Sequence, residues 1–178
     1  MRNILGRSFF ERSAVEVAPE LLGAYLVRRL PDGTITRHLI VEVEAYEGIE
    51  DRASHASRGR TPRTEVMFGP AGHWYVYFVY GMHEMLNIVT GPVNHPGAVL
   101  IRAVEGINGP GRVTKKLCVT RDLNKNKANR ASGLWIEKDF GSSVPGTITQ
   151  TSRIGVDYAR EWAQKPWRFV LDTKNKET

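Results

Sequence analysis

The stretch VEVEAY, residues 41–46, contains residue types that could carry out acid–base chemistry. Side chains alternate between the two faces of a strand, which places Glu42, Glu44 and Tyr46 on one face and the two valines on the other. The carboxylates could act as a pair, as in glycosidases, or one of them could act alone as a general base beside the phenol ring. A half-exposed strand with solvated glutamates has the same pattern. The spacing leaves all three interpretations open.

A second stretch, HWYVYFVYGMH, spans residues 73–83 and carries five aromatic rings within residues 74–80. Two β-rich runs flank Tyr80-Gly81-Met82-His83, which predicts a hairpin with its turn at these residues. Alternation places Tyr77 and Tyr80 on opposite faces. The rings could form an ordinary core or a platform on which nucleic-acid bases stack. The residues expected to pack inside the protein are Trp74, Val76, Phe78 and Val79.

The chain of 178 residues has 25 lysines and arginines against 19 aspartates and glutamates, a formal net charge of +6. Its length and its hydrophobic content of 41% fit one globular domain. The positive charge favours a polyanionic partner, nucleic acid or a membrane surface, although a merely basic protein has the same balance. The single cysteine, Cys118, excludes an intrachain disulfide and fits a reducing compartment. Since no signal peptide or membrane-spanning segment is recognisable, we expect a cytoplasmic protein without membrane contact, associated with the nucleoid if bacterial.

Basic side chains are clustered in segments that could contact nucleic-acid phosphates without reading sequence. NGPGRVTKK, residues 108–116, has the glycines and basic residues of a phosphate-binding helix start, although a solvated basic helix has the same composition. The candidate contacts are Arg58, Arg60, Arg63, Arg112, Lys115 and Lys116. The histidines His73, His83 and His95 lack a recognisable metal-ligand spacing, so we expect neither a metal nor another cofactor.

Periodicity and turn signals predict the elements that must position these residues. Ser8 is expected to cap a short helix over FFERS, and residues 14–27 begin as a helix and continue as a strand. Residues 47–70 are polar and contain Gly and Pro, which predicts a long surface loop with one helical turn. The predicted strands are TITRHLIVEVEAY, WYVYFV, MLNIVT, AVLIRAV, ASGLWIEK, TITQTSRIGV and PWRFVL, and the further predicted helix is GPGRVTKKLCVT.

Together these elements predict one α+β domain over residues 1–178, built on a curved antiparallel sheet of open-barrel-like form. Helices flank this sheet, and the aromatic hairpin protrudes from it. Residues 172–178 are expected to form a polar, frayed tail.

Five blocks of the sequence, in this order, closely resemble the alkyladenine (3-methyladenine) DNA glycosylase family. They are VEVEAYEGIEDRASHASRGRTPRTEVMF, YVYFVYGMHEMLN, AVLIRAVE, NGPGRVTKKL and RIGVDYAREWAQKPWRFV, and they cover most of the chain. The resemblance implies an enzyme that flips damaged purines out of double-stranded DNA and hydrolyses their N-glycosidic bond, leaving an abasic site. The implied substrates are 3-methyladenine, 7-methylguanine, hypoxanthine and ethenoadenine. It further implies a monofunctional, metal-free base-excision-repair enzyme, which we expect to be a monomer.

The resemblance also assigns catalytic roles to individual residues. It implies that Glu44 deprotonates the attacking water, that Arg102 helps to hold this water, and that the backbone carbonyl of Ile154 contacts it as well. Because one base is then sufficient, Glu42 is left with a structural role. No lysine is needed for a Schiff base, so strand cleavage is not expected.

Other residues are implied to bind the flipped base and the duplex. The resemblance assigns the walls of the base pocket to Tyr46, His55 and Tyr77. Asn87 is implied to disfavour the exocyclic amine of guanine. Tyr80 is implied to fill the place of the extruded nucleotide, with Met82 beside it, as aromatic wedges do in the minor groove. Glu84 departs from the apolar or aromatic residue expected there, and an acid near phosphates is unfavourable.

The charge state of the damaged base matters for such a pocket. A cationic alkylated purine stacks well on tyrosine rings through cation–π attraction and is a good leaving group. Neutral hypoxanthine is a poorer leaving group, so its excision should depend more on protonation.

Two other function classes fit parts of the sequence. A non-catalytic nucleic-acid-binding module would use the aromatic hairpin as a stacking platform, but it has no need of Glu44 and Arg102 beside an aromatic pocket. A small-molecule hydrolase would use Glu42 and Glu44 as a pair, but an enzyme for neutral sugars has no need of a basic surface.

Overall fold

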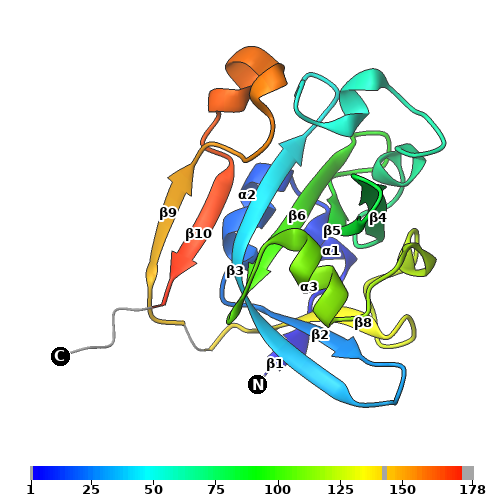
Figure 1. Cartoon of the computed structure of the whole chain (residues 1–178), viewed down its shortest axis with the longest axis vertical. Coiled ribbons are helices and arrows are strands. Elements are labelled where there is room, and N and C mark those ends of the chain that lie inside the picture. Colours follow the sequence, from blue (N-terminus) through cyan, green and yellow to red (C-terminus); the bar gives the residue numbers. More distant parts are fainter. Residues whose placement is uncertain (1, 142–143, 174–178) are drawn as a thin grey trace.

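The computed structural model describes residues 2–141 and 144–173 and shows one curled antiparallel sheet with short helices around it (Figure 1). Within these residues the strand order is β1-β8-β2-β3-β6-β5-β4, with β10 beside β3, β9 beside β10 and β7 beside β6. The strands are β1 (Arg2–Ile4), β2 (Tyr25–Arg29), β3 (Ile35–Glu47), β4 (Trp74–Val79), β5 (His83–Thr90), β6 (Gly97–Val104), β7 (Ile107–Asn108), β8 (Leu134–Asp139), β9 (Thr147–Thr151) and β10 (Arg168–Asp172). The α-helices are α1 (Arg7–Phe10), α2 (Ala14–Leu21) and α3 (Pro110–Lys116), and the 3₁₀ helices are η1 (His55–Arg58), η2 (Glu65–Phe68), η3 (Arg121–Leu123) and η4 (Asp157–Gln164). The predicted α+β class and curved antiparallel sheet are confirmed.

The long strand β3 joins the two halves of the sheet. Its first half pairs with β2 and its second half with β10, while β6 pairs with it from Ile40 to Glu47. Two register shifts, between Ile40 and Glu42 and between Glu42 and Val43, interrupt the pairing with β6. Such bulges bend a strand and increase its twist, so the sheet curls within the segment that carries the two candidate carboxylates.

Helix α2 begins at a capping box. The Ser13 hydroxyl accepts a hydrogen bond from the backbone N–H of Glu16, and the Glu16 carboxylate accepts one from the N–H of Ser13. This pair satisfies two donors that the first turn of a helix leaves free. The buried face of the helix consists of Ala14, Val17, Ala18 and Leu21.

The predicted cap at Ser8 is wrong. Helix α1 begins at Arg7 with Gly6 at its N-cap position, so Ser8 lies inside the helix. The Ser-x-x-Glu spacing is present at Ser8 and Glu11, but the Glu11 carboxylate is bound to the Arg7 guanidinium at 2.6 Å instead.

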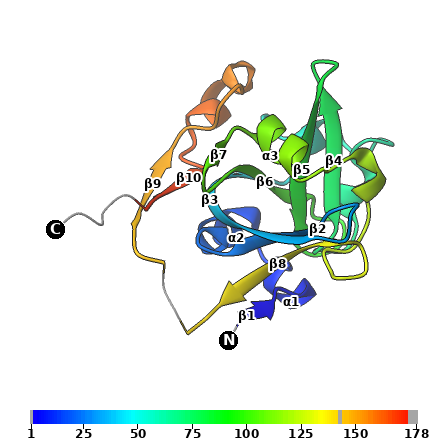
Figure 2. The ribbon, with the colours of Figure 1, turned by 60° about the horizontal axis from the view of Figure 1, so that its bottom comes forward.

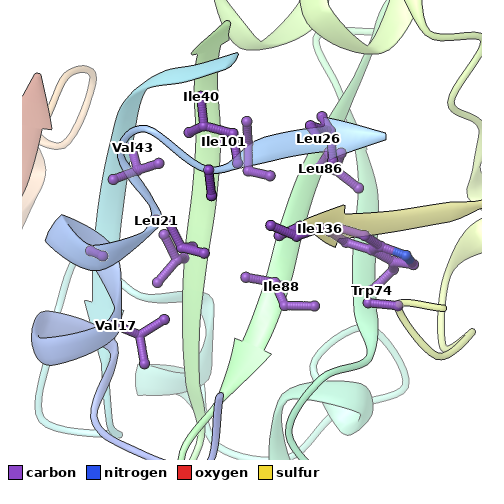
Figure 3. Close-up of a cluster of buried hydrophobic side chains, with 14 of the residues drawn as sticks. Val17, Leu21, Leu26, Ile40, Val43, Trp74, Leu86, Ile88, Ile101 and Ile136 are labelled. Atoms are coloured by element: carbon purple, nitrogen blue, oxygen red, sulfur yellow. The ribbon is translucent and has the colours of Figure 1, made fainter. Parts of the chain in front are cut away.

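The main core lies between α2 and one face of the sheet (Figure 3). Val17 and Leu21 of α2 lie beside Val43 of β3 and Ile101 of β6, all fully buried. Trp74 closes the far end of this core, and its indole N–H donates to the carbonyl of Leu134 at 3.1 Å. Burial of this face leaves the opposite face of β3, β4, β5 and β6 free for a functional site.

Other local predictions are partly confirmed. The segment 47–70 contains two 3₁₀ turns, η1 and η2, in place of the single predicted turn. The strand predicted over TITQTSRIGV ends at Thr151, and β1, β7 and η4 have no counterpart in the prediction. The expected tail over residues 172–178 begins later than predicted, because Asp172 is the last residue of β10 and pairs with Thr147 of β9. Residues 174–178 lie outside the described residues.

Candidate active site

A pocket of about 340 Å³ lies on the face of the sheet opposite the core. Side chains that alternate with core residues line it, as the period of two in a strand requires. From β3, β4, β5 and β6 they are Tyr46, Tyr75, Tyr77, Val79, Met85, Asn87, Ala98, Leu100 and Arg102. The loop 48–70 and the segment 154–158 cover the sides with Ala53, Ser54, His55, Met67, Ile154, Gly155, Val156 and Tyr158, while Tyr80 and Pro110 also contribute.

Glu44 lies directly behind this pocket. Its side chain is completely buried, and it contacts three residues that do line the pocket. The Tyr46 hydroxyl donates to Oε2 at 2.8 Å, the backbone N–H of Ile154 donates to Oε1 at 2.8 Å, and Arg102 Nη1 lies 3.4 Å from Oε2. These donors stabilise negative charge on the carboxylate. A carboxylate has about four lone-pair sites, so Glu44 retains capacity to accept from a water molecule.

Glu42, two residues earlier on the same face, has different partners. Arg102 Nε and Arg168 Nε both donate to Glu42 Oε1, at 2.9 and 2.7 Å. Glu42 therefore holds Arg102, which in turn reaches Glu44. The two carboxylates are parts of one charge network, Arg168–Glu42–Arg102–Glu44, in which only Glu44 also contacts Tyr46 and Ile154.

A buried ion pair fixes the segment that contains Ile154. Arg153 and Asp51 are fully buried and form a bidentate pair with N–O distances of 2.5 and 2.8 Å. Arg153 also donates to the carbonyls of Ala45 and Trp162, and its guanidinium lies 4.8 Å from the centre of the Tyr46 ring. This pair could not be recognised from the sequence because its members lie 102 residues apart, in two separate blocks of the family resemblance.

Aromatic side chains make up most of the pocket wall that strand β4 and the loop 48–70 provide. His55 packs edge-on against Tyr77 with centroids 4.6 Å apart, and its Nδ1 lies 2.9 Å from the Tyr75 hydroxyl. Burial, together with the charges of Arg63 and Arg58, lowers the pKa of His55 to about 4, so the ring is neutral at pH 7. Tyr75 was not singled out from the sequence, although it shares the strand face of Tyr77.

Burial also affects the ionisation of the tyrosines. It is the largest cause that raises the pKa of Tyr46, with the neighbouring Glu44 carboxylate second. The pKa of Tyr77 is likewise raised, mainly by burial. Both hydroxyls therefore stay protonated, and Tyr46 remains a donor to Glu44. Asn87 is fixed by its amide, which donates to the carbonyl of Tyr75 at 3.1 Å.

The hairpin between β4 and β5 protrudes from the molecule, on the same side as η4 (Figure 2). Its turn is closed by the N–H of Met82, which donates to the carbonyl of Val79 at 3.1 Å. Tyr80 and Gly81 both have positive φ, as in type I′ hairpin turns. Tyr80 is 83% and Met82 68% exposed. Tyr80 borders the same pocket as Tyr77, although alternation alone would place them on opposite faces, because the turn ends the alternation.

Two further expectations for this hairpin are corrected by the structure. Phe78 does not pack inside: it is 39% exposed, and the guanidinium of Arg121 lies 4.7 Å from its ring centre. Val79 lines the pocket and does not join the core. Trp74 and Val76 are buried as predicted. The unusual Glu84 is paired with Arg121 at 3.2 Å, which compensates its charge.

The basic candidates lie in different environments. Arg60 pairs with Glu65 at 3.0 Å and stacks on Phe68, whereas Arg63 lies 4.9 Å from the centre of the Tyr77 ring. Arg112, Lys115 and Lys116 are exposed on α3, which begins after Gly109 as predicted, and Arg58 is exposed at the end of η1. These exposed positions are accessible to a partner at the surface.

The described part of the chain was searched for clusters of metal-binding side chains and for membrane-spanning helices. Residues 2–141 and 144–173 contain no group of three or more His, Cys, Asp or Glu placed to hold a metal ion. None of the helices in these residues is long and apolar enough to cross a membrane.

Comparisons with known proteins agree with the resemblance in the five sequence blocks. The family described as Methylpurine-DNA glycosylase (MPG) matches residues 8–108 and 106–175. A protein of Myxococcus xanthus (strain DK1622) is 46% identical over 188 aligned residues, covering 97% of this chain and 93% of the relative. A protein of Methanocella arvoryzae (strain DSM 22066 / NBRC 105507 / MRE50) is 44% identical over 93% of this chain and 91% of its own length. Both carry the name "Putative 3-methyladenine DNA glycosylase".

The family pattern therefore spans almost the whole chain, and the relatives match it at nearly full length. The residues that connect Glu44 to the pocket all lie within the matched ranges. The chain belongs to the methylpurine-DNA glycosylase family.

Proposed function

We propose that this chain is a 3-methyladenine DNA glycosylase of base excision repair, which flips a damaged purine out of duplex DNA and hydrolyses its N-glycosidic bond. Family membership and the names of the relatives support this activity. The observation that carries it is Glu44, a buried and hydrogen-bonded carboxylate directly behind a pocket with aromatic walls. The substrate range includes 3-methyladenine, 7-methylguanine, hypoxanthine and ethenoadenine.

Glu44 acts as the general base. A water molecule between its carboxylate and the sugar gives a proton to Glu44 while the water oxygen bonds to C1′ and the bond from C1′ to the purine nitrogen breaks. Arg102 and the carbonyl of Ile154 help to hold this water. The donors on Glu44 from Tyr46 and Ile154 hold its carboxylate in a fixed orientation. The departing base takes the bonding electrons, which is easy for a cationic purine and requires protonation for hypoxanthine.

The pocket holds the flipped base between aromatic rings. Tyr46 forms one wall and the Tyr77–His55 pair another. Stacking on such rings contributes about 1–3 kcal/mol per base and tolerates many purines. Asn87 disfavours the exocyclic amine of normal guanine. Tyr80, exposed at the hairpin tip, fills the gap that the extruded nucleotide leaves, with Met82 beside it.

The paired-carboxylate alternative has less support. Glu42 Oε1 accepts from both Arg102 and Arg168, so this carboxylate is engaged in holding the arginines. A role as the acid of a carboxylate pair would require this group to give up its contacts with the two guanidinium groups.

Glu44→Gln tests the assignment of the base. The variant should bind a duplex with one hypoxanthine as tightly as the wild type and excise the base about 10²–10⁴-fold more slowly, the usual contribution of a general base. Excision is measured in single turnover, with alkali treatment to reveal abasic sites. Near wild-type excision by the variant would exclude Glu44 as the base.

Glu42→Gln is the matched control on the same strand face. Its amide oxygen still accepts from the arginines, so excision should fall far less than in Glu44→Gln. Equal losses in the two variants would support a carboxylate pair. If the wild-type chain excises no alkylated or deaminated purine from any duplex, the non-catalytic binding module is the better interpretation.

A further inference from the structure

Two tyrosines of the pocket wall each have an arginine beside the ring. The guanidinium of Arg153 lies 4.8 Å from the centre of the Tyr46 ring, and that of Arg63 lies 4.9 Å from the centre of the Tyr77 ring. Both tyrosines line the pocket and neither arginine does. Each guanidinium therefore lies against a tyrosine ring of the wall without being part of the pocket lining.

The two arginines differ in whether their charge is compensated. Arg153 forms the buried bidentate pair with Asp51. Arg63 makes no ion pair within residues 2–141 and 144–173. Its positive charge therefore acts at the Tyr77 wall with no ion-pair partner among the described residues.

The remaining charges around the pocket do not compensate for Arg63. Among the described lining residues Arg102 is the one with a formal charge at neutral pH, and it belongs to the network in which two carboxylates, Glu42 and Glu44, balance two guanidinium groups, Arg102 and Arg168. His55 is neutral there, because burial and the charges of Arg63 and Arg58 lower its pKa to about 4. No carboxylate lines the pocket in the described part of the chain. A positively charged base would thus meet an uncompensated positive charge across Tyr77.

We propose that Arg63 is a specificity-determining residue that disfavours cationic N-alkylpurines relative to neutral lesion purines in the flipped position. A ring that is attracted to Arg63 on one side attracts a cation on its other side less strongly, because the two like charges repel through it. A neutral purine such as hypoxanthine stacks on the same ring without this repulsion. This effect works against the cation–π advantage that tyrosine walls alone would give to alkylated bases.

The inference rests on the proposed function, since it concerns the base that the glycosylase flips. The property that Arg63 would change is how tightly the pocket holds the flipped base. Cationic purines leave easily, so they are still excised once in the pocket. Because Arg63 is exposed, water and salt screen its charge, and the expected effect is about two- to fivefold.

The test compares two duplexes that differ in one base, hypoxanthine or 7-methylguanine. Single-turnover excision is followed at increasing enzyme concentration, and the half-saturating concentration is measured for each duplex. Arg63→Gln should lower the half-saturating concentration for 7-methylguanine relative to that for hypoxanthine about two- to fivefold. Arg63→Lys keeps the charge and should leave the ratio close to that of the wild type.

Arg60→Gln is the matched control from the same loop. Arg60 also stacks on a ring, that of Phe68, but Phe68 does not line the pocket and Arg60 is paired with Glu65. The ratio should therefore not change in this variant. An unchanged ratio in Arg63→Gln, or an equal loss for both duplexes as expected of a phosphate contact, would overturn the inference. Failure of the wild type to excise either base would instead overturn the proposed function.

Discussion

The two ends of the site differ in how firmly the protein holds them. At one end, Glu44 is completely buried and is held by Tyr46, Arg102 and the backbone of Ile154. At the other end, the hairpin tip places Tyr80 and Met82 in solvent with 83% and 68% of their surface exposed. A Cβ added at Gly81, between them, would meet no atom within 4 Å.

This difference follows from what each end has to do in the proposed reaction. A general base must be held close to the geometry of the reacting atoms, which requires a network in which each side chain fixes the next. A wedge that enters the base stack acquires its contacts only from the DNA, so it must stay exposed until the duplex is bound. We therefore expect changes at the buried end to affect stability and catalysis together, and changes at the tip to affect DNA binding alone.

Arg153→Met should have the largest effect. It leaves Asp51 buried without its partner, and breaking a buried ion pair costs about 3–5 kcal/mol. It also frees the segment that presents the N–H of Ile154 to Glu44. Urea unfolding measures the loss of stability, and single-turnover excision measures the loss of activity in the fraction that remains folded.

Arg60→Met provides the comparison with an exposed ion pair. Arg60 and Glu65 are each nearly half exposed, so this change should cost less than about 1 kcal/mol. A similar loss of stability in Arg153→Met and Arg60→Met would mean that the buried end of the site is held no more firmly than the surface.

Acidic pH should destabilise the pocket wall through His55. Its folded pKa, about 4, lies below the ordinary value of 6.5, so below pH 6.5 the unfolded chain binds a proton that the folded chain excludes. Stability should therefore fall as the pH drops from 6.5 to 4 and change no further from this group below 4, by roughly 3 kcal/mol in total. Unfolding curves over this range should be compared with those of His55→Gln, which lacks the titrating ring. Parallel pH dependence in the two proteins would contradict this role of His55.

The sequence predicts the strand-borne half of this site well. Period-two alternation places Glu44 and Tyr46 on the face opposite Val43, and the structure confirms this separation of pocket and core. The same rule applied to β4 would have found Tyr75 beside Tyr77. Alternation fails at Tyr80, where positive φ in the turn redirects the side chain. It also cannot show that the Phe78 ring contacts Arg121 and solvent and does not pack in a core.

The half of the site held by irregular segments could not be predicted in the same way. Asp51 lies in a polar loop and Arg153 beyond β9, and neither position has a periodicity that indicates burial. Their pairing depends on the curl of the sheet, which brings β10 and the segment after β9 beside β3. Arg63 similarly gains its role only because the loop 48–70 folds back over Tyr77. A single sequence contains the charges but not the distances between them.

Tyr80→Ala should have a smaller effect than Arg153→Met or the protonation of His55, confined to the exposed end. The side chain makes few contacts with the folded chain because 83% of its surface is exposed, so the midpoint of urea unfolding should stay close to that of the wild type. Loss of one stacking ring should weaken binding to a lesion-containing duplex about tenfold, or ~1.4 kcal/mol. Tyr80→Phe, which keeps the ring, should restore most of the affinity, and the lesion-free duplex should lose less because its bases stay stacked. A Tyr80→Ala variant that binds normally but unfolds more easily would show that the tip serves the fold, and the contrast between the two ends would then fail.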